Sequence, residues 1–245
     1  MRTSPSLSSV QLPRKPVDDV IAACTEIVLT KKYSLHPFVS QLAELRPDKT
    51  ALGRWALQKY HQVRLQNAIF SIIHAKTALR DVRQFMIEQL VAEETTFTCG
   101  SDAHYNLMGR FAVACGVEPD TLLQSHASEA VETYVNTLLS IMREEHFTVG
   151  LLTIYAIESQ SSESVGKLMT VLRREYDFSL ADLEWFAVHA DEDDDHADEG
   201  LRLVKRYADL SDDFDMRAVH AVNRICEAWL KLHDFYAATL RQAAN

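Results

Sequence analysis

Two long segments of this 245-residue chain, 54–99 and 167–199, contain neither glycine nor proline. The whole chain has only 7 Gly and 6 Pro, which is few for a fold with many strands and tight turns, because these two residues punctuate both. Apolar residues recur at helical spacing, as in Val20, Ile21 and Cys24. The sequence therefore predicts an all-α protein.

The helical pattern continues along the chain without a strand pattern, an internal repeat or a dividing linker. Residues 1–16 form a Ser/Pro-rich tail that we expect to be flexible, and residues 17–245 are expected to form one bundle of seven to ten helices. The predicted helices are 17–31, 36–45, 49–76, 80–95, one capped by Ser101 or Asp102 that runs to Cys115, a short one from Pro119, 128–145, 147–176, 180–207 with Ser179 as its N-cap, and 214–243.

Charge and cysteine content limit the classes of function. The net charge of −10 argues against nucleic acid or an anionic membrane surface as a partner. The four cysteines are scattered, with neither disulfide-framework nor zinc-site spacing, which favours a reducing compartment. There is no apolar signal-peptide stretch in the tail and no apolar run near the length of a membrane span, about 20 residues. We expect a soluble, cytoplasmic protein.

The segment WFAVHADEDDDHADEGL carries a stripe of possible metal ligands. On one continuous helix, His189, Asp193 and His196 return to nearly the same side, because the offsets of four and seven residues are close to whole turns. Imidazole nitrogens and carboxylate oxygens are donors that iron or manganese accepts. The competing interpretation is a solvated acidic helix, since residues 191–199 include seven acids. From the stripe alone, both interpretations stay open.

Other hard donors stand at the ends of apolar stretches. Glu158 ends GLLTIYAIE, and Glu93 and Glu94 follow an apolar run, so at least one of these two should face inward. His104 begins a helix with apolar residues at helical spacing. Each has an ordinary structural explanation, such as an ion-paired Glu or a core His. Together they resemble the way in which helix bundles build carboxylate-bridged dimetal sites. The patterns HExxH, Walker A, GxSxG and GxGxxG, and the ferritin-type Glu-x-x-His, are all absent.

The chain resembles the haem-oxygenase-like superfamily, which includes thiaminase II and pyrroloquinoline-quinone synthase. Within that superfamily it most resembles the haem-oxygenase-like di-iron oxidases and oxygenases. The resemblance covers about residues 33–240. It is carried by HPFVSQL, RWALQKYHQV, LVAEE with HYNLMGRFAVACGV, YAIESQ and WFAVHADEDDDHADEGL, of which the last two are the most specific. Thiaminase II-like members carry a nucleophilic Cys before the third motif, and HFTVGLLTIYAIE has none. The fold implied is a single haem-oxygenase-like helical bundle.

The resemblance also implies a ligand set and a cofactor. The ligands carried over are Glu93 (or Glu94), His104, Glu158, His189, Asp193 and His196. Between Glu93 and His104 this chain has more residues, TTFTCGSDA, than the usual family spacing, which leaves the choice between Glu93 and Glu94 open. The cofactor implied is a pair of Fe(II) ions, with manganese as the alternative metal and O₂ as co-substrate. His36 is the residue nearest in position to the proximal His of haem oxygenases.

The function that follows is an O₂-dependent, non-haem di-iron oxidase or oxygenase. Its substrate is expected to be a small organic molecule, namely an amino acid, an amine or a fatty acid in specialised metabolism. Two alternatives remain at this point: a metal-free oxidase like the quinone synthase, and a non-enzymatic interaction protein on the same fold. We expect no nucleic-acid or membrane partner, and leave assembly as a homodimer open.

Overall fold

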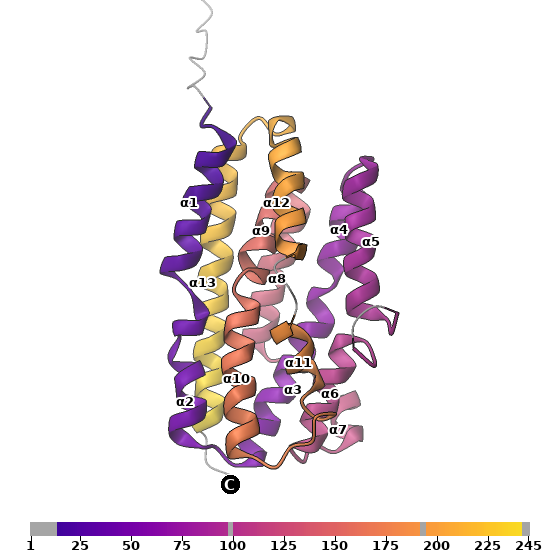
Figure 1. Ribbon diagram of the computed structural model, residues 1–245, viewed down its shortest axis with the longest axis vertical. Coiled ribbons are helices and arrows are strands. Elements are labelled where there is room, and N and C mark those ends of the chain that lie inside the picture. Colours follow the sequence, from indigo (N-terminus) through magenta and orange to yellow (C-terminus); the bar gives the residue numbers. More distant parts are fainter. Residues whose placement is uncertain (1–13, 98–99, 192–194, 242–245) are drawn as a thin grey trace, which may run out of the picture.

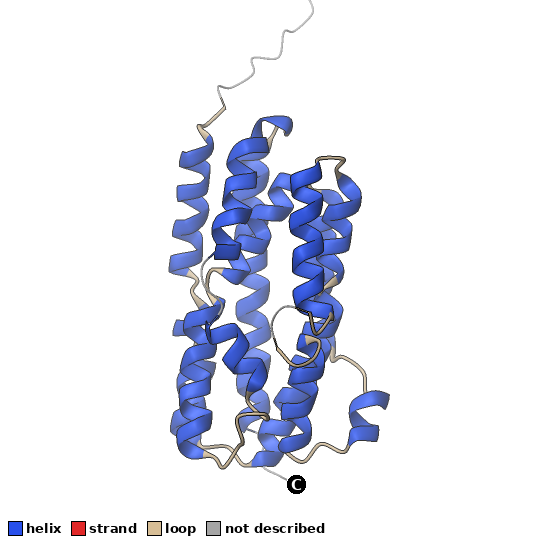
Figure 2. Cartoon of the chain, turned by 45° about the vertical axis from the view of Figure 1, so that its right-hand side comes forward, coloured by secondary structure: helices blue, strands red, loops and turns tan. Residues whose placement is uncertain are grey.

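A computed structural model describes residues 14–97, 100–191 and 195–241, and for residues 191 and 195–197 only the backbone. In these ranges the chain is helical and has no strand (Figure 2). The helices are α1 (Val17–Thr30), α2 (Pro37–Leu45), α3 (Lys49–Gln66), α4 (Ala68–Lys76), α5 (Arg80–Glu94), α6 (His104–Ala114), α7 (Pro119–Gln124), α8 (Glu129–Glu144), α9 (Phe147–Glu158), α10 (Ser161–Glu175), α11 (Glu184–Asp191), α12 (Asp195–Tyr207) and α13 (Phe214–Arg241), with 3₁₀ turns at Tyr33–Leu35 and Ala208–Leu210. The all-α prediction is confirmed.

The longest helix, α13, runs along most of the bundle (Figure 1). It packs against α1, α2, α3, α8 and α9. The buried side chains form one hydrophobic cluster, and its largest fully buried members include Trp55, Phe111, Tyr134, Phe186 and Tyr236. On the other side of the bundle, α3 packs against α6, and α11 lies against α6 and α10. These contacts bring the ends of α5, α6 and α11 together inside the bundle.

Two of the predicted helices are each divided in two near a polar residue, Asn67 in one and Gln160 in the other, whose side chain forms a specific hydrogen bond. The range 49–76 is split at Asn67, which is buried and donates a hydrogen bond from Nδ2 to Glu94 on α5 at 3.1 Å. The range 147–176 is split after Glu158. There Gln160 donates from Nε2 to the carbonyl of Ala156 at 2.6 Å, which satisfies a carbonyl at the end of α9. Side-chain partners of this kind leave no mark in hydrophobic periodicity.

The predicted helix 180–207 begins later than expected, because residues 180–183 form a turn and α11 starts at Glu184. Within the described residues α11 ends at Asp191 and α12 begins at Asp195. Residues 191–195 are five consecutive acids. Residues 192–194, between the two helices, lie outside the described residues, so the continuity of the predicted helix at that point stays a prediction. Ser179 and Asp182 form the reciprocal bonds of a capping box, at 2.9 and 3.2 Å, but a turn separates them from α11.

The cap predicted for the helix ending near Cys115 is also wrong. The helix α6 begins at His104, and its N-cap position is Ala103, with no side-chain cap. Asp102 instead bonds the backbone N of Ala103 and the amide of Asn106, while Ser101 bonds Glu184. Ser128, by contrast, caps α8 through the backbone N of Val131. None of the described helices is both long and apolar enough to cross a lipid bilayer.

Candidate metal centre

Three of the predicted ligands meet where three helices end. Glu93 is the penultimate residue of α5, His104 is the first residue of α6, and His189 lies in the last turn of α11. One donor atom from each lies within 4.8 Å of the other two. The two histidines are buried, and the Glu93 side chain is 18% exposed. This spacing allows all three side chains to reach one metal ion.

Glu93 and His104 are in direct contact. Oε2 of Glu93 lies 3.2 Å from Nδ1 of His104. Burial acts to raise the pKa of Glu93, but the hydrogen bond and charge of His104, with His189 and Lys59, outweigh burial and lower it. The Glu93 side chain is therefore a carboxylate at neutral pH, which is the form that coordinates a metal.

The orientation of His189 is set by its own helix. Nδ1 donates a hydrogen bond to the carbonyl oxygen of Trp185 at 2.8 Å. A carbonyl can only accept, so the proton is on Nδ1 and the lone pair is on Nε2. The ring stacks on Trp185 with centroids 4.2 Å apart and meets the ring of His104 edge-on at 4.7 Å. Burial is the main cause that lowers the pKa of His189 to about 4, so its imidazole is neutral at pH 7. A neutral ring fixed through Nδ1 is the usual state of a metal-ligating histidine.

Glu93, not Glu94, is brought to the histidines. Glu94 is exposed and accepts a hydrogen bond from the amide of Asn67 at 3.1 Å. Consecutive helical residues point about 100° apart, so only one of the two can face the cluster.

Glu158, the last residue of α9, lies on a cavity shared with the cluster. The cavity encloses about 100 Å³ and is lined by Glu93, His189 and Glu158 together with largely apolar residues. Its other lining residues include Lys59, Val63, Ile69, Phe70, Gln89, Leu138, Ile154, Val165, Trp185 and Trp229. Glu158 is thus on the same cavity, although it is not one of the three residues within 4.8 Å of one another.

The last two predicted ligands are not placed. Asp193 lies outside the described residues. His196 lies on α12, but its side chain is outside the described part of the chain. Their role as ligands remains a prediction. The prediction that all three lie on one continuous helical stripe also stays a prediction, because residues 192–194 lie outside the described residues.

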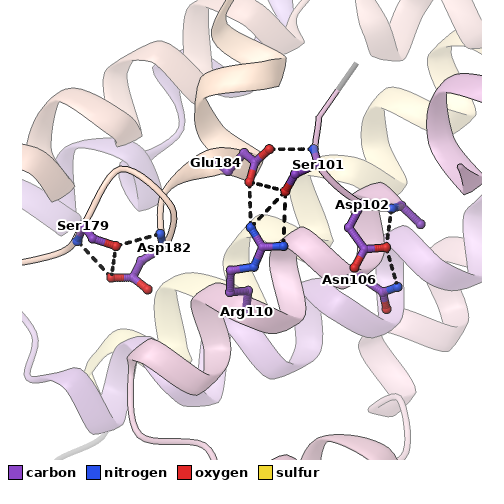
Figure 3. A network of polar contacts seen from close by, with 8 residues as sticks. Ser101, Asp102, Asn106, Arg110, Ser179, Asp182 and Glu184 are labelled. Carbon is purple, nitrogen blue, oxygen red and sulfur yellow. Dashed lines mark hydrogen bonds and ion pairs between the residues drawn. The ribbon is translucent and has the colours of Figure 1, made fainter. Parts of the chain in front are cut away.

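A polar network ties together the two helices that carry the histidines (Figure 3). Glu184, at the start of α11, accepts from the backbone N of Ser101 at 2.6 Å, from the Ser101 hydroxyl at 2.7 Å, and from Nη1 of Arg110 on α6 at 2.6 Å. Arg110 also donates to the Ser101 hydroxyl at 3.3 Å. The network fixes α6, α11 and the segment before α6 relative to one another, and so holds His104 near His189.

Lys59 was not among the predicted site residues. It lines the cavity from α3, and its ammonium faces the rings of Trp185 and Trp229. Burial lowers its pKa to about 7, and the negative charge of Glu93 acts against this shift. One sequence signal was available: Lys59 lies midway between the apolar Trp55 and Val63, at offsets of four residues that place it on the inner face.

His36 has a structural role. Its Nδ1 accepts from the backbone N of Phe38 at 3.1 Å, which makes it the N-cap of α2. Its Nε2 lies 3.2 Å from Asp234. Both ring nitrogens have protein partners, so this residue does not match the proximal ligand of a haem.

Comparison with known proteins defines the class to which this fold and this cluster belong. Residues 53–230 match the family described as "Iron-containing redox enzyme". A TenA homologue from Pseudomonas syringae superposes with a TM-score of 0.70 over 96% of this chain and 97% of its own, at 13% identity. A domain with a haem-oxygenase-like fold from Shewanella denitrificans gives a TM-score of 0.66 over 89% of both chains, also at 13% identity.

The chain therefore belongs to the haem-oxygenase-like family of iron-containing redox enzymes. The predicted single helical bundle of this type is confirmed. Among curated proteins, the chain is similar to a 4-aminobenzoate synthase from Nitrosomonas europaea, with 26% identity over 228 residues that cover 87% of this chain and 91% of the relative.

Proposed function

We propose that this protein is a non-haem di-iron enzyme that uses O₂ to oxidise a small organic substrate. The observation that carries the proposal is the cluster of Glu93, His104 and His189, which opens onto a mostly apolar cavity that also holds Glu158. A carboxylate with two imidazoles is a donor set typical of non-haem iron. Membership of a family of iron-containing redox enzymes supports the same metal.

The residues present fit an iron ion. The carboxylate of Glu93 is ionised and the Nε2 lone pair of His189 is available, so neither needs to lose a proton before it binds metal. When bound, two ferrous ions would supply the electrons for O₂ reduction. The protein would hold those ions at the ends of α5, α6, α9 and α11, with His196 and Asp193 as further predicted ligands. The apolar cavity would exclude bulk water from the reacting groups.

We further propose that the product is 4-aminobenzoate or a closely related aromatic amine. The support is the similarity to curated relatives that are named 4-aminobenzoate synthases. Oxidative formation of a small aromatic acid is compatible with a buried redox centre beside a mostly apolar cavity.

Iron content tests the metal assignment. Protein reconstituted with Fe(II) without oxygen should hold two iron ions per chain by elemental analysis. Glu93→Gln should lose iron, because a neutral amide is a much weaker ligand than a carboxylate. Glu94→Gln is the matched control and should keep it, because Glu94 bonds Asn67 instead. Iron-free protein that is fully active would favour the metal-free oxidase.

Growth tests the product. The wild-type gene should restore growth without added 4-aminobenzoate to a bacterial strain that lacks its own 4-aminobenzoate-forming enzymes. His104→Ala should not restore growth, since it removes a fully buried member of the cluster. Mass-spectrometric detection of 4-aminobenzoate in the rescued cells makes the test independent of growth rate. No product from iron-loaded wild type, in cells or in oxygenated extract, would refute the assignment.

A further inference from the structure

Lys59 places an ammonium group in the cavity between two indole rings. Its Nζ lies 5.1 Å from the ring centroid of Trp185 on α11 and 5.5 Å from that of Trp229 on α13. Nζ also donates a hydrogen bond to Oε1 of Gln62 at 3.1 Å. An ammonium has three N–H donors. Lys59 therefore has further N–H groups that can donate to a ligand in the cavity that it lines.

Three side chains that line the same cavity each carry a buried N–H group that lacks an acceptor. Nε2 of Gln89 and the indole Nε1 atoms of Trp185 and Trp229 are buried and have no hydrogen-bond partner among the described residues. The side chains that carry them are 5%, 3% and 7% exposed, respectively. Buried donors are nearly always paired, because leaving one unpaired is costly. The side chains that line the cavity therefore include three with a buried N–H that has no acceptor.

The carboxylates of the cavity do not supply the missing acceptors. Among its described lining residues the acids are Glu93 and Glu158, and in the proposed function both bind metal. Among the described lining residues, Lys59 is the one lysine or arginine, and its protonated side chain brings a positive charge to the cavity wall. A complementary ligand carries a negative charge with several lone pairs, next to an apolar body.

We propose that Lys59, with the N–H groups of Gln89, Trp185 and Trp229 that line the same cavity, is the receptor for the carboxylate of an aromatic acid. This proposal rests on the proposed function, and names the group by which its substrate or product is held. A carboxylate offers about four lone-pair sites and forms strong, charge-assisted hydrogen bonds with an ammonium. The aromatic ring would lie against Val63, Phe70 and the other apolar lining residues.

The ammonium is held in position before any ligand arrives. Oε1 of Gln62, which accepts from Lys59, also accepts from the hydroxyl of Tyr236 at 2.8 Å. Nε2 of Gln62 donates to Oε1 of Gln66 at 3.0 Å. Gln62 is fully buried, so these bonds lock its amide and with it the Lys59 head group. A receptor fixed in this way loses little conformational freedom on binding.

The test compares two ligands that differ in one group. Calorimetric titration of the chelator-treated, metal-free chain with 4-aminobenzoate and with 4-aminobenzamide measures the preference for the carboxylate without any contribution from iron. Wild type should bind the acid at least about tenfold more tightly than the amide, because the acid forms charge-assisted hydrogen bonds. Lys59→Met should lose this preference. Lys49→Met is the matched control, since Lys49 also lies over an aromatic ring, that of Phe178, but is exposed at the start of α3.

Equal affinity of wild type for the two ligands, no binding of either, or a preference kept by Lys59→Met would overturn the proposal. If Lys59→Met does not fold, Lys59→Arg, which keeps the cation, should keep the preference, and the wild-type comparison remains decisive. The outcome is separable from that of the proposed function. Wild type that shows the preference but holds no iron contradicts the di-iron assignment alone, whereas wild type that holds iron and shows no preference contradicts the receptor alone.

Discussion

Arg110 on α6 and Glu184 on α11 form an ion pair, with Nη1 and Oε2 2.6 Å apart. Arg110 lies six residues after His104, and Glu184 lies five residues before His189. The pair therefore couples the two helices that supply the imidazoles of the candidate metal centre. The Ser101 hydroxyl joins the same pair, so the segment leading into α6 is fixed by the same contacts.

Removal of this ion pair should weaken metal binding. We expect Arg110→Leu to lower the Fe(II) affinity by about tenfold, the low end for loss of a group that supports metal ligands. Competitive titration against a chelator measures the affinity. Arg202→Leu is the control, because Arg202 pairs with Glu199 on the surface of α12 and such pairs contribute little. Equal affinities in the two variants would show that the pair does not position the histidines.

Two glycines with positive φ should respond differently to alanine. Gly100 (φ 80°) and Gly116 (φ 93°) both have left-handed backbones, so each substitution should cost roughly 1 kcal/mol of unfolding free energy. A Cβ on Gly100 would also meet Leu107 at 3.0 Å and Val188, the neighbour of His189, at 3.5 Å, whereas one on Gly116 meets nothing within 4 Å. Denaturant melts should show that both variants are destabilised. Fe(II) titration should show weaker binding only in Gly100→Ala, and equal weakening in both would contradict this account.

The buried neutral histidines should make the protein acid-sensitive. Burial lowers the pKa of His233 to about 3, from the model-peptide value of 6.5. Between about pH 3 and pH 6.5 the unfolded chain binds a proton at His233 that the folded chain does not. The contribution of His233 to the free energy of unfolding is therefore fully present above about pH 6.5 and is lost as the pH falls. The contribution of His233 to this slope is at most about 1.4 kcal/mol per pH unit.

Urea melts of the metal-free protein from pH 7 to pH 4 measure this slope. His233→Gln should give a shallower slope than wild type, whatever its absolute stability, because one titrating group has been removed. His220→Gln is the matched control, since His220 is an exposed residue of the same helix, α13, and this variant should keep the wild-type slope. A slope in His233→Gln as steep as that of wild type would mean that His233 is not held neutral.

The two predicted ligands on the acidic segment can be tested by stoichiometry. His196→Ala should lower the iron content from two ions per chain to about one, because losing one imidazole weakens only the ion that it binds. His220→Ala should leave the content at two. Elemental analysis after anaerobic loading gives the numbers, and an unchanged content in His196→Ala would remove His196 from the ligand set.

Hydrophobic periodicity was sufficient to predict the fold class, because each helix buries one stripe of apolar residues. It failed at Asn67 and Gln160, whose side chains bond to elements distant in sequence: Asn67 donates to Glu94 on α5, and Oε1 of Gln160 accepts from the backbone N of Tyr33 at 3.1 Å.

The part of the candidate site that could be predicted consists of donors at the ends of apolar runs in the sequence, such as Glu93 and Glu158. The choice between Glu93 and Glu94 could not be predicted, because it depends on how α5 is rotated against α6, which only packing sets. Lys59 was missed because a lysine is usually assigned to the surface. Its position midway between Trp55 and Val63 on the inner face of α3 was the signal against that assignment.

Three of the candidate ligands, unlike His104 at the start of α6, lie near the C-terminal ends of their helices. Glu93 and His189 lie in the last turns of α5 and α11, and Glu158 is the final residue of α9. The C-terminal end of a helix carries partial negative charge from its unpaired carbonyls. The ends of α5 and α9, whose last-turn carboxylates line one cavity, would favour a divalent cation through the backbone, before any side chain coordinates it. The same field disfavours an anion, and the ammonium of Lys59, which lines the same cavity, offsets that effect.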